Sequence, residues 1–244
     1  MRGPRAPIVT WSLLSALGGV FALEVLWGDA GPRTLLAMGA NVPALTRGGE
    51  VERLLAATTL HVTPAHAVMN LYVLWALGVG LERLFGRTRF IVLYFLSGLG
   101  GAIGTTLFGG PGGSAGASGA IWGLLVAAAV LAFRRIPGMH PAAVAAARRS
   151  AITNLLLNVG ISFLPGIDRW AHFGGGLAGG LLVGLGILVP PSLLRARGEA
   201  EDPLHERSLQ AVAVFLVLAT LGSVAVAWWR GEPWWLAETS TLAP

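Results

Sequence analysis

One serine of the sequence lies among small residues at the start of an apolar run. Residues 116–123 read GASGAIWG, and the apolar run that contains Ser118 continues to Phe133. In membrane helices small residues allow neighbouring backbones to approach closely, and this packing role is the ordinary explanation for such a segment. The same small neighbours would also let the backbone of a substrate reach a nucleophilic hydroxyl. The residues around Ser118 therefore indicate either helix packing or a nucleophile.

Several other polar residues could act together with this serine. His66 and Asn70 are four residues apart and would share one face of a helix. His172 comes two residues before a run of three glycines. A histidine beside a serine hydroxyl can accept its proton and so activate it as a nucleophile. A zinc site made of His61, His66 and His172 is an alternative, but no H-E-x-x-H pattern or nearby carboxylate pair supports it. We therefore predict no metal and no other cofactor.

The composition is that of a membrane protein. Of the 244 residues, 54% are hydrophobic and 12% are charged, whereas soluble domains carry about 25% charged residues. The mean hydropathy is +0.68. Because the chain has no cysteine, disulfides and thiolate chemistry are excluded. All 17 basic residues are arginines in short segments, with no run of five, so we expect no nucleic-acid partner.

Apolar stretches of about 20 residues, the length that crosses a bilayer as a helix, recur along the chain. We predict an all-α polytopic membrane protein. Six helices would form a domain at residues 1–189, a cytoplasmic linker would follow at 190–207, and an additional transmembrane helix with a short outer tail would occupy 208–244. The first stretch is long for a signal peptide, so we interpret it as a retained helix, with cleavage as the alternative. The seven stretches are 8–27, 65–83, 89–108, 117–133, 143–164, 170–189 and 208–229.

The distribution of arginines predicts how these helices are oriented. With the N-terminus in the cytoplasm, twelve of the 17 arginines fall in cytoplasmic segments and five in outer ones, as the positive-inside rule requires. Ser118 and His172 then lie near the outer ends of the fourth and sixth helices, level with His66 and Asn70 on the second. Polar groups inside a bilayer are costly and are therefore functional candidates. The glycines of the fourth and sixth helices would let these helices pack closely and bring His172 within hydrogen-bond reach of Ser118.

Three features of the connecting segments have more than one interpretation. Asp168 would cap the outer end of the sixth helix, or alternatively orient His172 as the acid of a triad. Residues 50–60 (EVERLLAATTL) could form a short helix in the membrane interface. The last helix follows the polar segment 190–207 and could be an appendage to the first six.

Taken together, these residues resemble the rhomboid family of intramembrane serine proteases over roughly residues 49–184. Each motif alone is weak, but the order and spacing of all of them agree with the family. The motifs are Arg53-Leu54, HVTPAHAVMN at 61–70, LERLFG at 81–86, Arg89-Phe90, GASGAIWG at 116–123 and AHFGGGLAG at 171–179.

The resemblance implies a catalytic dyad with an oxyanion hole. Ser118 would be the nucleophile and His172 the general base, without a required acid. His66, Asn70 and the backbone N–H of Ser118 would form the oxyanion hole.

The resemblance also implies roles for residues around this dyad. Gly116 would leave space for the substrate to approach, and Trp122 would pack against the catalytic histidine. Glu82 matches a structural acidic position, and we expect it to pair with a nearby arginine. The sequence departs from the family where Glu52 stands before Arg53 in the outer loop, because the family usually has an aromatic residue there.

The implied function is cleavage of the transmembrane segments of single-span membrane proteins near the outer membrane face. We expect an integral protein of a bacterial plasma membrane, with the N-terminus in the cytoplasm, the C-terminus outside, and the lipid bilayer and membrane-protein substrates as partners. No oligomeric state is predicted. One alternative is a catalytically inactive rhomboid-like protein that binds membrane clients, which the intact site residues disfavour. Another is a small transporter or channel, which would predict internal repeats or broken helices, and no convincing repeat is present.

Overall fold

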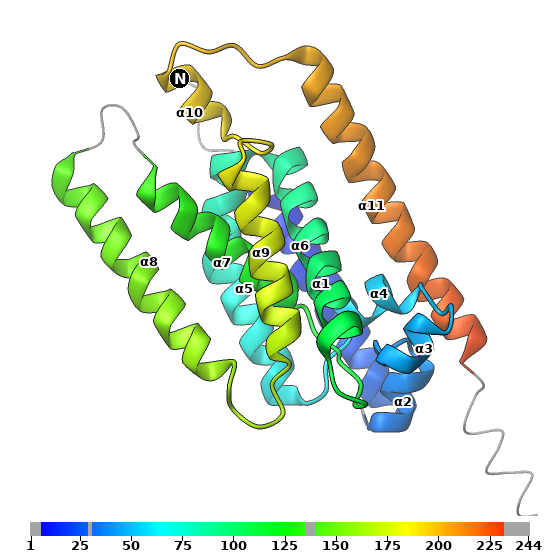
Figure 1. Ribbon diagram of the computed structural model, residues 1–244. Helices are drawn as coiled ribbons and strands as arrows, with labels where there is room; N and C mark the ends of the chain where they lie inside the picture. The colour runs from blue at the N-terminus through cyan, green and yellow to red at the C-terminus, as the bar shows by residue number, and fades with distance from the viewer. Residues whose placement is uncertain (1–5, 29–30, 135–139, 232–244) are drawn as a thin grey trace, which may run out of the picture.

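The structure is a computed structural model, and it describes residues 6–28, 31–134 and 140–231 (Figure 1). The regular elements in these ranges are helices, and the one pairing of extended backbone is an isolated bridge between Asn41 and Ser114. The elements are α1 (Ile8–Gly28), α2 (Pro32–Ala37), α3 (Pro43–Arg47), α4 (Arg53–Ala56), the 3₁₀ helix η1 (Ala57–Thr59), α5 (Pro64–Phe85), α6 (Arg87–Phe108), α7 (Ser118–Phe133), α8 (Pro141–Ile161), α9 (Arg169–Gly184), α10 (Pro191–Ala196) and α11 (Pro203–Arg230).

The long helices correspond to the seven predicted stretches. Helices α1, α5, α6 and α11 are each long and apolar enough to cross a membrane, and α7 is a shorter apolar helix. The predicted all-α polytopic membrane fold is therefore confirmed, and a helix is present at each of the seven predicted stretches. Arg2, Arg5 and Arg135, which we used to predict the orientation, and the predicted tail at 232–244 lie outside the described residues.

The centre of the bundle consists of α6, α7 and α9, which pack closely against one another (Figure 1). Glycines make this approach possible. A Cβ atom on Gly175 of α9 would overlap the carbonyl oxygen of Gly119 on α7, and one on Gly179 would overlap that of Gly123. The backbones of α7 and α9 therefore touch directly, as is typical of small-residue interfaces in membrane helices. This contact fixes the start of α7 beside the start of α9.

Glu82 near the end of α5 caps another helix. Its carboxylate accepts hydrogen bonds from the backbone N–H groups of Val9 at 3.0 Å and Thr10 at 2.7 Å, and from the Thr10 hydroxyl at 2.7 Å. The first N–H groups of a helix have no partner inside it and carry partial positive charge. Among the described residues, the first turn of α1 thus takes the place of the arginine that we predicted as the partner of Glu82.

The segment between α1 and α5 is folded against the bundle. The helix predicted at 50–60 is present in part, as α4 and η1. It does not lie free in the interface, because it packs against α6 and α11 and Ala56 is completely buried. Arg53 holds the segment together by donating hydrogen bonds to the backbone oxygens of Leu36 at 2.8 Å and Ala40 at 2.9 Å. The matching arginine of the family motif is therefore a structural residue of this loop.

Helix α11 is attached to this loop and is not a separate appendage. It packs along α6 and α4, and Figure 1 shows it crossing the full height of the bundle at one edge. The Arg230 guanidinium lies 2.7 Å from the carboxylate of Glu52, the residue that replaces the usual aromatic of the family. Gly39, with φ of +102°, lies so close to Ala227 that a Cβ atom on it would be 2.7 Å from the alanine methyl. Glu52, where this sequence departs from the family motif, thus forms an ion pair with Arg230 of the seventh helix.

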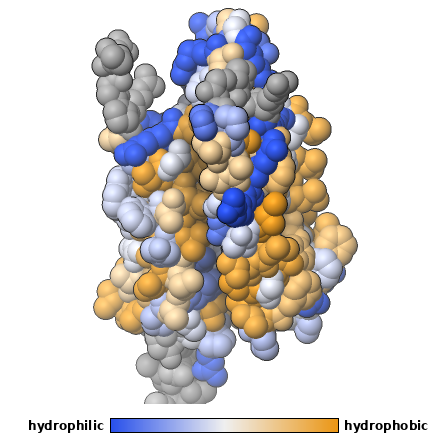
Figure 2. Space-filling model, turned by 90° about the vertical axis from the view of Figure 1, so that its left-hand side faces the viewer, coloured by the Kyte–Doolittle hydropathy of each residue, from blue (hydrophilic) through white to orange (hydrophobic). Residues whose placement is uncertain are grey.

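Helix α8 is the least enclosed of the long helices. It packs mainly against α7, none of its residues is buried, and it stands at the edge of the bundle opposite α11 (Figure 1). Figure 2 shows this side of the molecule, where apolar side chains cover much of the middle and hydrophilic ones gather at the upper end. Helix α8 is therefore held by few contacts within the protein.

Candidate active site

Ser118 is the first residue of α7, and the segment before it is held firmly. Gly116 has φ of +145° and donates its backbone N–H to the carbonyl of Ala57 at 2.9 Å. The backbone of Ser114 pairs in both directions with that of Asn41 at 2.9 Å. Ser118 itself is half-buried, and in the first turn of a helix the backbone N–H groups have no partner inside the helix. A hydroxyl and backbone N–H groups without a partner inside the helix therefore lie side by side at the start of α7.

His172 lies on the first turn of α9 and is buried, with 7% of its surface exposed. The Trp122 ring, one helical turn after Ser118, stacks on the His172 ring at a centroid distance of 5.3 Å and an angle of 24°. The predicted contact between the aromatic residue and the histidine is present. Among the described residues Ser118 makes no hydrogen bond with His172, and in substrate-free sites such bonds are often long.

His66 and Asn70 lie on α5 and face Gly116. The α5 helix begins after Thr63, whose hydroxyl accepts the His66 backbone N–H at 3.1 Å. A Cβ atom on Gly116 would be 2.8 Å from Cε1 of His66 and 3.5 Å from Nδ2 of Asn70. The Nδ2 of Asn70 is buried and has no hydrogen-bond partner among the described residues. An unpaired buried donor calls for an explanation, and here it lies beside the backbone that leads into Ser118.

Asp168 caps α9, and among the described residues its carboxylate makes no hydrogen bond with the His172 ring. One carboxylate oxygen accepts the backbone N–H groups of Trp170 at 3.0 Å and Ala171 at 3.1 Å, and the other accepts the Thr105 hydroxyl at 2.5 Å. Of the two interpretations of Asp168, the geometry fits the helix cap. The Nδ1 atom of His172 has another partner, the Ser162 hydroxyl, at 2.7 Å.

The sequence model of the Rhomboid domain matches residues 48–189, which is more than half of the chain. This chain belongs to the rhomboid family. It is 35% identical to rhomboid protease GluP of Bacillus subtilis (strain 168) over 177 residues, which cover 70% of this chain and 32% of GluP. It is 27% identical to rhomboid protease AarA of Providencia stuartii over 189 residues, which cover 68% of this chain and 66% of AarA.

A plant relative matches over a longer stretch. RHOMBOID-like protein 6, mitochondrial, of Arabidopsis thaliana is 35% identical over 210 residues, which cover 82% of this chain and 67% of that protein. The match covers a smaller share of some other relatives: this rhomboid chain spans about a third of the length of GluP. Family membership and the apolar helices establish an integral membrane protein.

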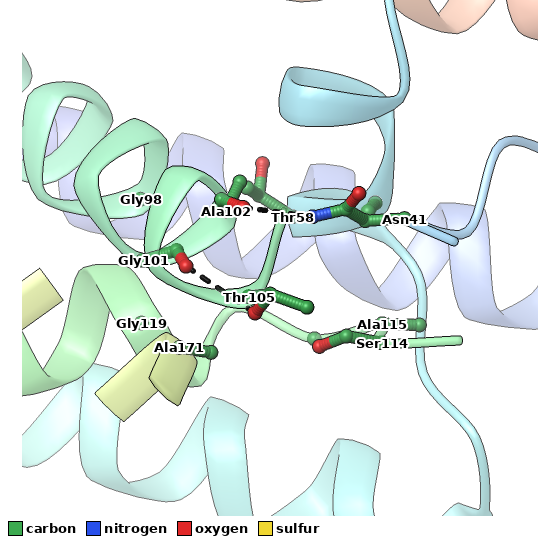
Figure 3. A pocket seen from close by; sticks show the side chains of 12 residues that line it. Asn41, Thr58, Gly98, Gly101, Ala102, Thr105, Ser114, Ala115, Gly119 and Ala171 are labelled. Carbon is green, nitrogen blue, oxygen red and sulfur yellow. Dashed lines mark hydrogen bonds between the residues drawn. The ribbon is translucent and has the colours of Figure 1, made fainter. Parts of the chain in front are cut away.

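A small cavity lies behind the candidate site of this rhomboid (Figure 3). Its volume is about 20 Å³, which is enough for about one water molecule. Asn41 and Thr105 line it, and so do Gly116 and Gly119. Asn41 donates a hydrogen bond to the carbonyl of Ala102 at 2.9 Å, which holds this wall in place. The cavity therefore borders residues close to Ser118 on both sides.

Sequence reasoning did not predict the contacts of three residues that support the site. Ser162 contacts His172, and Asn41 joins the outer loop to α6. Glu24 of α1 is completely buried, and both of its carboxylate oxygens lie 3.1 Å from the backbone nitrogen of His61, whose N–H they accept. An ionisable residue inside a membrane helix was the available signal for Glu24. For Ser162 and Asn41 the residue types carried no such signal.

Burial of His61 predicts that the folded protein loses stability as the pH falls. It precedes α5, is completely buried, and has no hydrogen-bond partner for either ring nitrogen among the described residues. Burial, and to a smaller extent His66, lower the pKa of His61 from 6.5 to about 4. As the pH falls, His61 therefore takes up a proton near pH 6.5 in the unfolded chain but only near pH 4 in the folded chain. The His61 contribution to stability is therefore complete above pH 6.5 and is lost as the pH falls toward 4, by up to about 3 kcal/mol.

Replacing His61 by phenylalanine should remove the pH-dependent part of the stability that comes from the His61 ring. The variant keeps a ring against Phe21, which meets the His61 ring edge-on at 6.2 Å, and it buries no unpaired nitrogen. In detergent micelles, the fall in Tm between pH 7.5 and pH 5 should be smaller in His61→Phe than in wild type. An equal fall in both proteins would show that His61 does not titrate as described.

Proposed function

We propose that this chain is an intramembrane serine endopeptidase that cuts membrane proteins by a dyad of Ser118 and His172. The proposal is carried by one observation: the N-terminal turns of three helices lie close together and bring the candidate residues to one place. The start of α7 brings Ser118, the start of α9 brings His172, and the start of α5 brings His66 and Asn70 to Gly116. A nucleophile, a base and donors for an oxyanion are the parts that acyl transfer needs.

In the proposed reaction Ser118 Oγ attacks the carbonyl carbon of the scissile peptide while Nε2 of His172 takes the hydroxyl proton. The carbonyl oxygen becomes an oxyanion, which the side chains of His66 and Asn70 and the Ser118 backbone N–H stabilise. His172 then gives its proton to the leaving amine as the peptide bond breaks. Water, deprotonated by His172, releases the acyl group and restores Ser118.

The proposed substrates are single-span membrane proteins cut near the outer face. In this arrangement the N-terminus lies in the cytoplasm of a bacterial cell, the C-terminus outside, and the site lies at the end of the bundle that carries α2, α3 and α4 (Figure 1). The proposed organisation is a catalytic domain at 1–189, a linker at 190–207 and an added helix at 208–244. The weakly enclosed α8 is the element whose movement would admit a substrate helix.

A fluorophosphonate probe tests whether Ser118 is activated. The probe forms a covalent bond with serine nucleophiles that have a base beside them. Wild type should be labelled, and Ser118→Ala should not. Ser114→Ala is a matched control, because Ser114 holds the loop through backbone atoms that alanine retains. An unlabelled wild type would instead favour the inactive rhomboid-like protein that binds membrane clients.

A further inference from the structure

The hydroxyl of Ser162 lies between two hydrogen-bonding atoms. Ser162 is the residue that follows α8 and is 1% exposed. Its Oγ atom is 2.8 Å from the backbone oxygen of Asn158 and 2.7 Å from Nδ1 of His172. Both distances are those of ordinary hydrogen bonds. The contact joins the end of α8 to the histidine on α9.

Only one arrangement of protons turns both contacts into hydrogen bonds. The Asn158 oxygen can only accept, so the single Ser162 proton must point toward it. The serine oxygen then accepts from His172, which requires a proton on Nδ1. If the serine donated to His172 instead, two oxygen atoms would face each other at 2.8 Å without a proton between them. The geometry therefore selects the histidine tautomer with a proton on Nδ1.

This tautomer is the one that a base acting through Nε2 needs. A neutral imidazole carries one proton, so a proton on Nδ1 leaves a lone pair on Nε2. In serine hydrolases a carboxylate usually selects the tautomer, but the Asp168 carboxylate is occupied by Thr105 and the first turn of α9. We propose that Ser162 is the positioning residue of His172, holding its ring and its reactive tautomer in place of a triad acid. This inference rests on the proposed function.

The place of Ser162 also ties the base to helix α8. None of the α8 residues is buried, but Ser162 at its end is, and its hydrogen bond to His172 joins the end of this helix to α9. When the end of α8 moves away, His172 loses the acceptor that fixes its tautomer.

Kinetics of Ser162→Ala test the inference. Because Ser162 is buried and contacts the base, kcat for a membrane substrate should fall about tenfold, the effect of one neutral hydrogen bond, while KM stays within about twofold. Ser162→Thr, which restores a hydroxyl, should recover most of kcat. Ser150→Ala removes an exposed serine of α8 and should match wild type. A wild-type kcat in Ser162→Ala, or a Thr variant as slow as the Ala variant, would overturn the inference.

Nitrogen NMR of histidine-labelled wild type gives a second test that does not depend on the folding of Ser162→Ala. Its His172 signals, assigned by their loss in His172→Ala, should show a protonated Nδ1 and an unprotonated Nε2 at neutral pH. A proton on Nε2 would contradict the proposed role of Ser162. Failure of the proposed function looks different, because wild type would then neither cleave substrate nor bind the fluorophosphonate whatever the tautomer.

Discussion

Gly175→Ala is expected to separate helices α7 and α9 and to destabilise the protein severely. A methyl group on Gly175 would overlap the carbonyl oxygen of Gly119, and backbone cannot rotate away as a side chain can. Overpacking of a close-packed interior usually costs about 1–3 kcal/mol, and we expect the upper end of this range or more. In detergent micelles the variant should show a Tm well below that of wild type, or should aggregate.

Gly184→Ala is the matched control for this substitution. Gly184 lies on the same helix, and a Cβ atom on it would meet nothing within 4 Å. Because alanine favours a helix over glycine by about 1 kcal/mol, this variant should be as stable as wild type or slightly more stable. A Tm of Gly175→Ala equal to that of Gly184→Ala would show that α7 and α9 are not in backbone contact.

Gly116→Ala should leave the bundle folded and remove most of the activity. A Cβ atom on Gly116 would be 2.8 Å from Cε1 and 3.0 Å from Nε2 of His66. An imidazole ring can turn aside, so the fold survives, but the ring is then displaced from the proposed oxyanion hole. Loss of one oxyanion donor typically lowers kcat by about 10²–10³. The positive φ of Gly116 adds backbone strain of about 1–3 kcal/mol, which thermal unfolding would detect.

The loop also offers a control for Gly116→Ala. Gly112 lies four residues earlier, and a Cβ atom on it would meet nothing within 4 Å. Cleavage by Gly112→Ala should match wild type in an assay where Gly116→Ala is at least a hundredfold slower. Equal rates in the two variants would argue that Gly116 does not adjoin an oxyanion hole.

The long apolar stretches made the helices predictable, because length and hydropathy determine which segments cross a bilayer. The end of the sixth helix was less predictable. It was expected at 189, but α9 ends at Gly184, and Gly186 follows with φ of +77°. A glycine in this conformation ends helices, but the sequence around it is as apolar as the helix itself. Composition alone therefore could not place this boundary.

The residues of the candidate site were proposed from their types and spacing, whereas several of the contacts around them could not be predicted. Spacing placed His66 and Asn70 on one helix face. The partner of Glu82 is a set of backbone N–H groups, which residue types do not reveal. Glu52 pairs with Arg230, 178 positions away. The contact of Ser162 with His172 depends on how the short segment after α8 returns to α9, and that segment has no periodic pattern.

The most direct test of the proposed function is cleavage of a single-span membrane protein in liposomes. Purified wild type should release two fragments cut at one membrane face. Ser118→Ala, folded to the same Tm, should be at least about 10⁴-fold slower, and Ser114→Ala should cut at the wild-type rate. If wild type leaves the substrate intact, or if Ser118→Ala cuts it as fast as wild type, the chain is not a serine protease acting through Ser118.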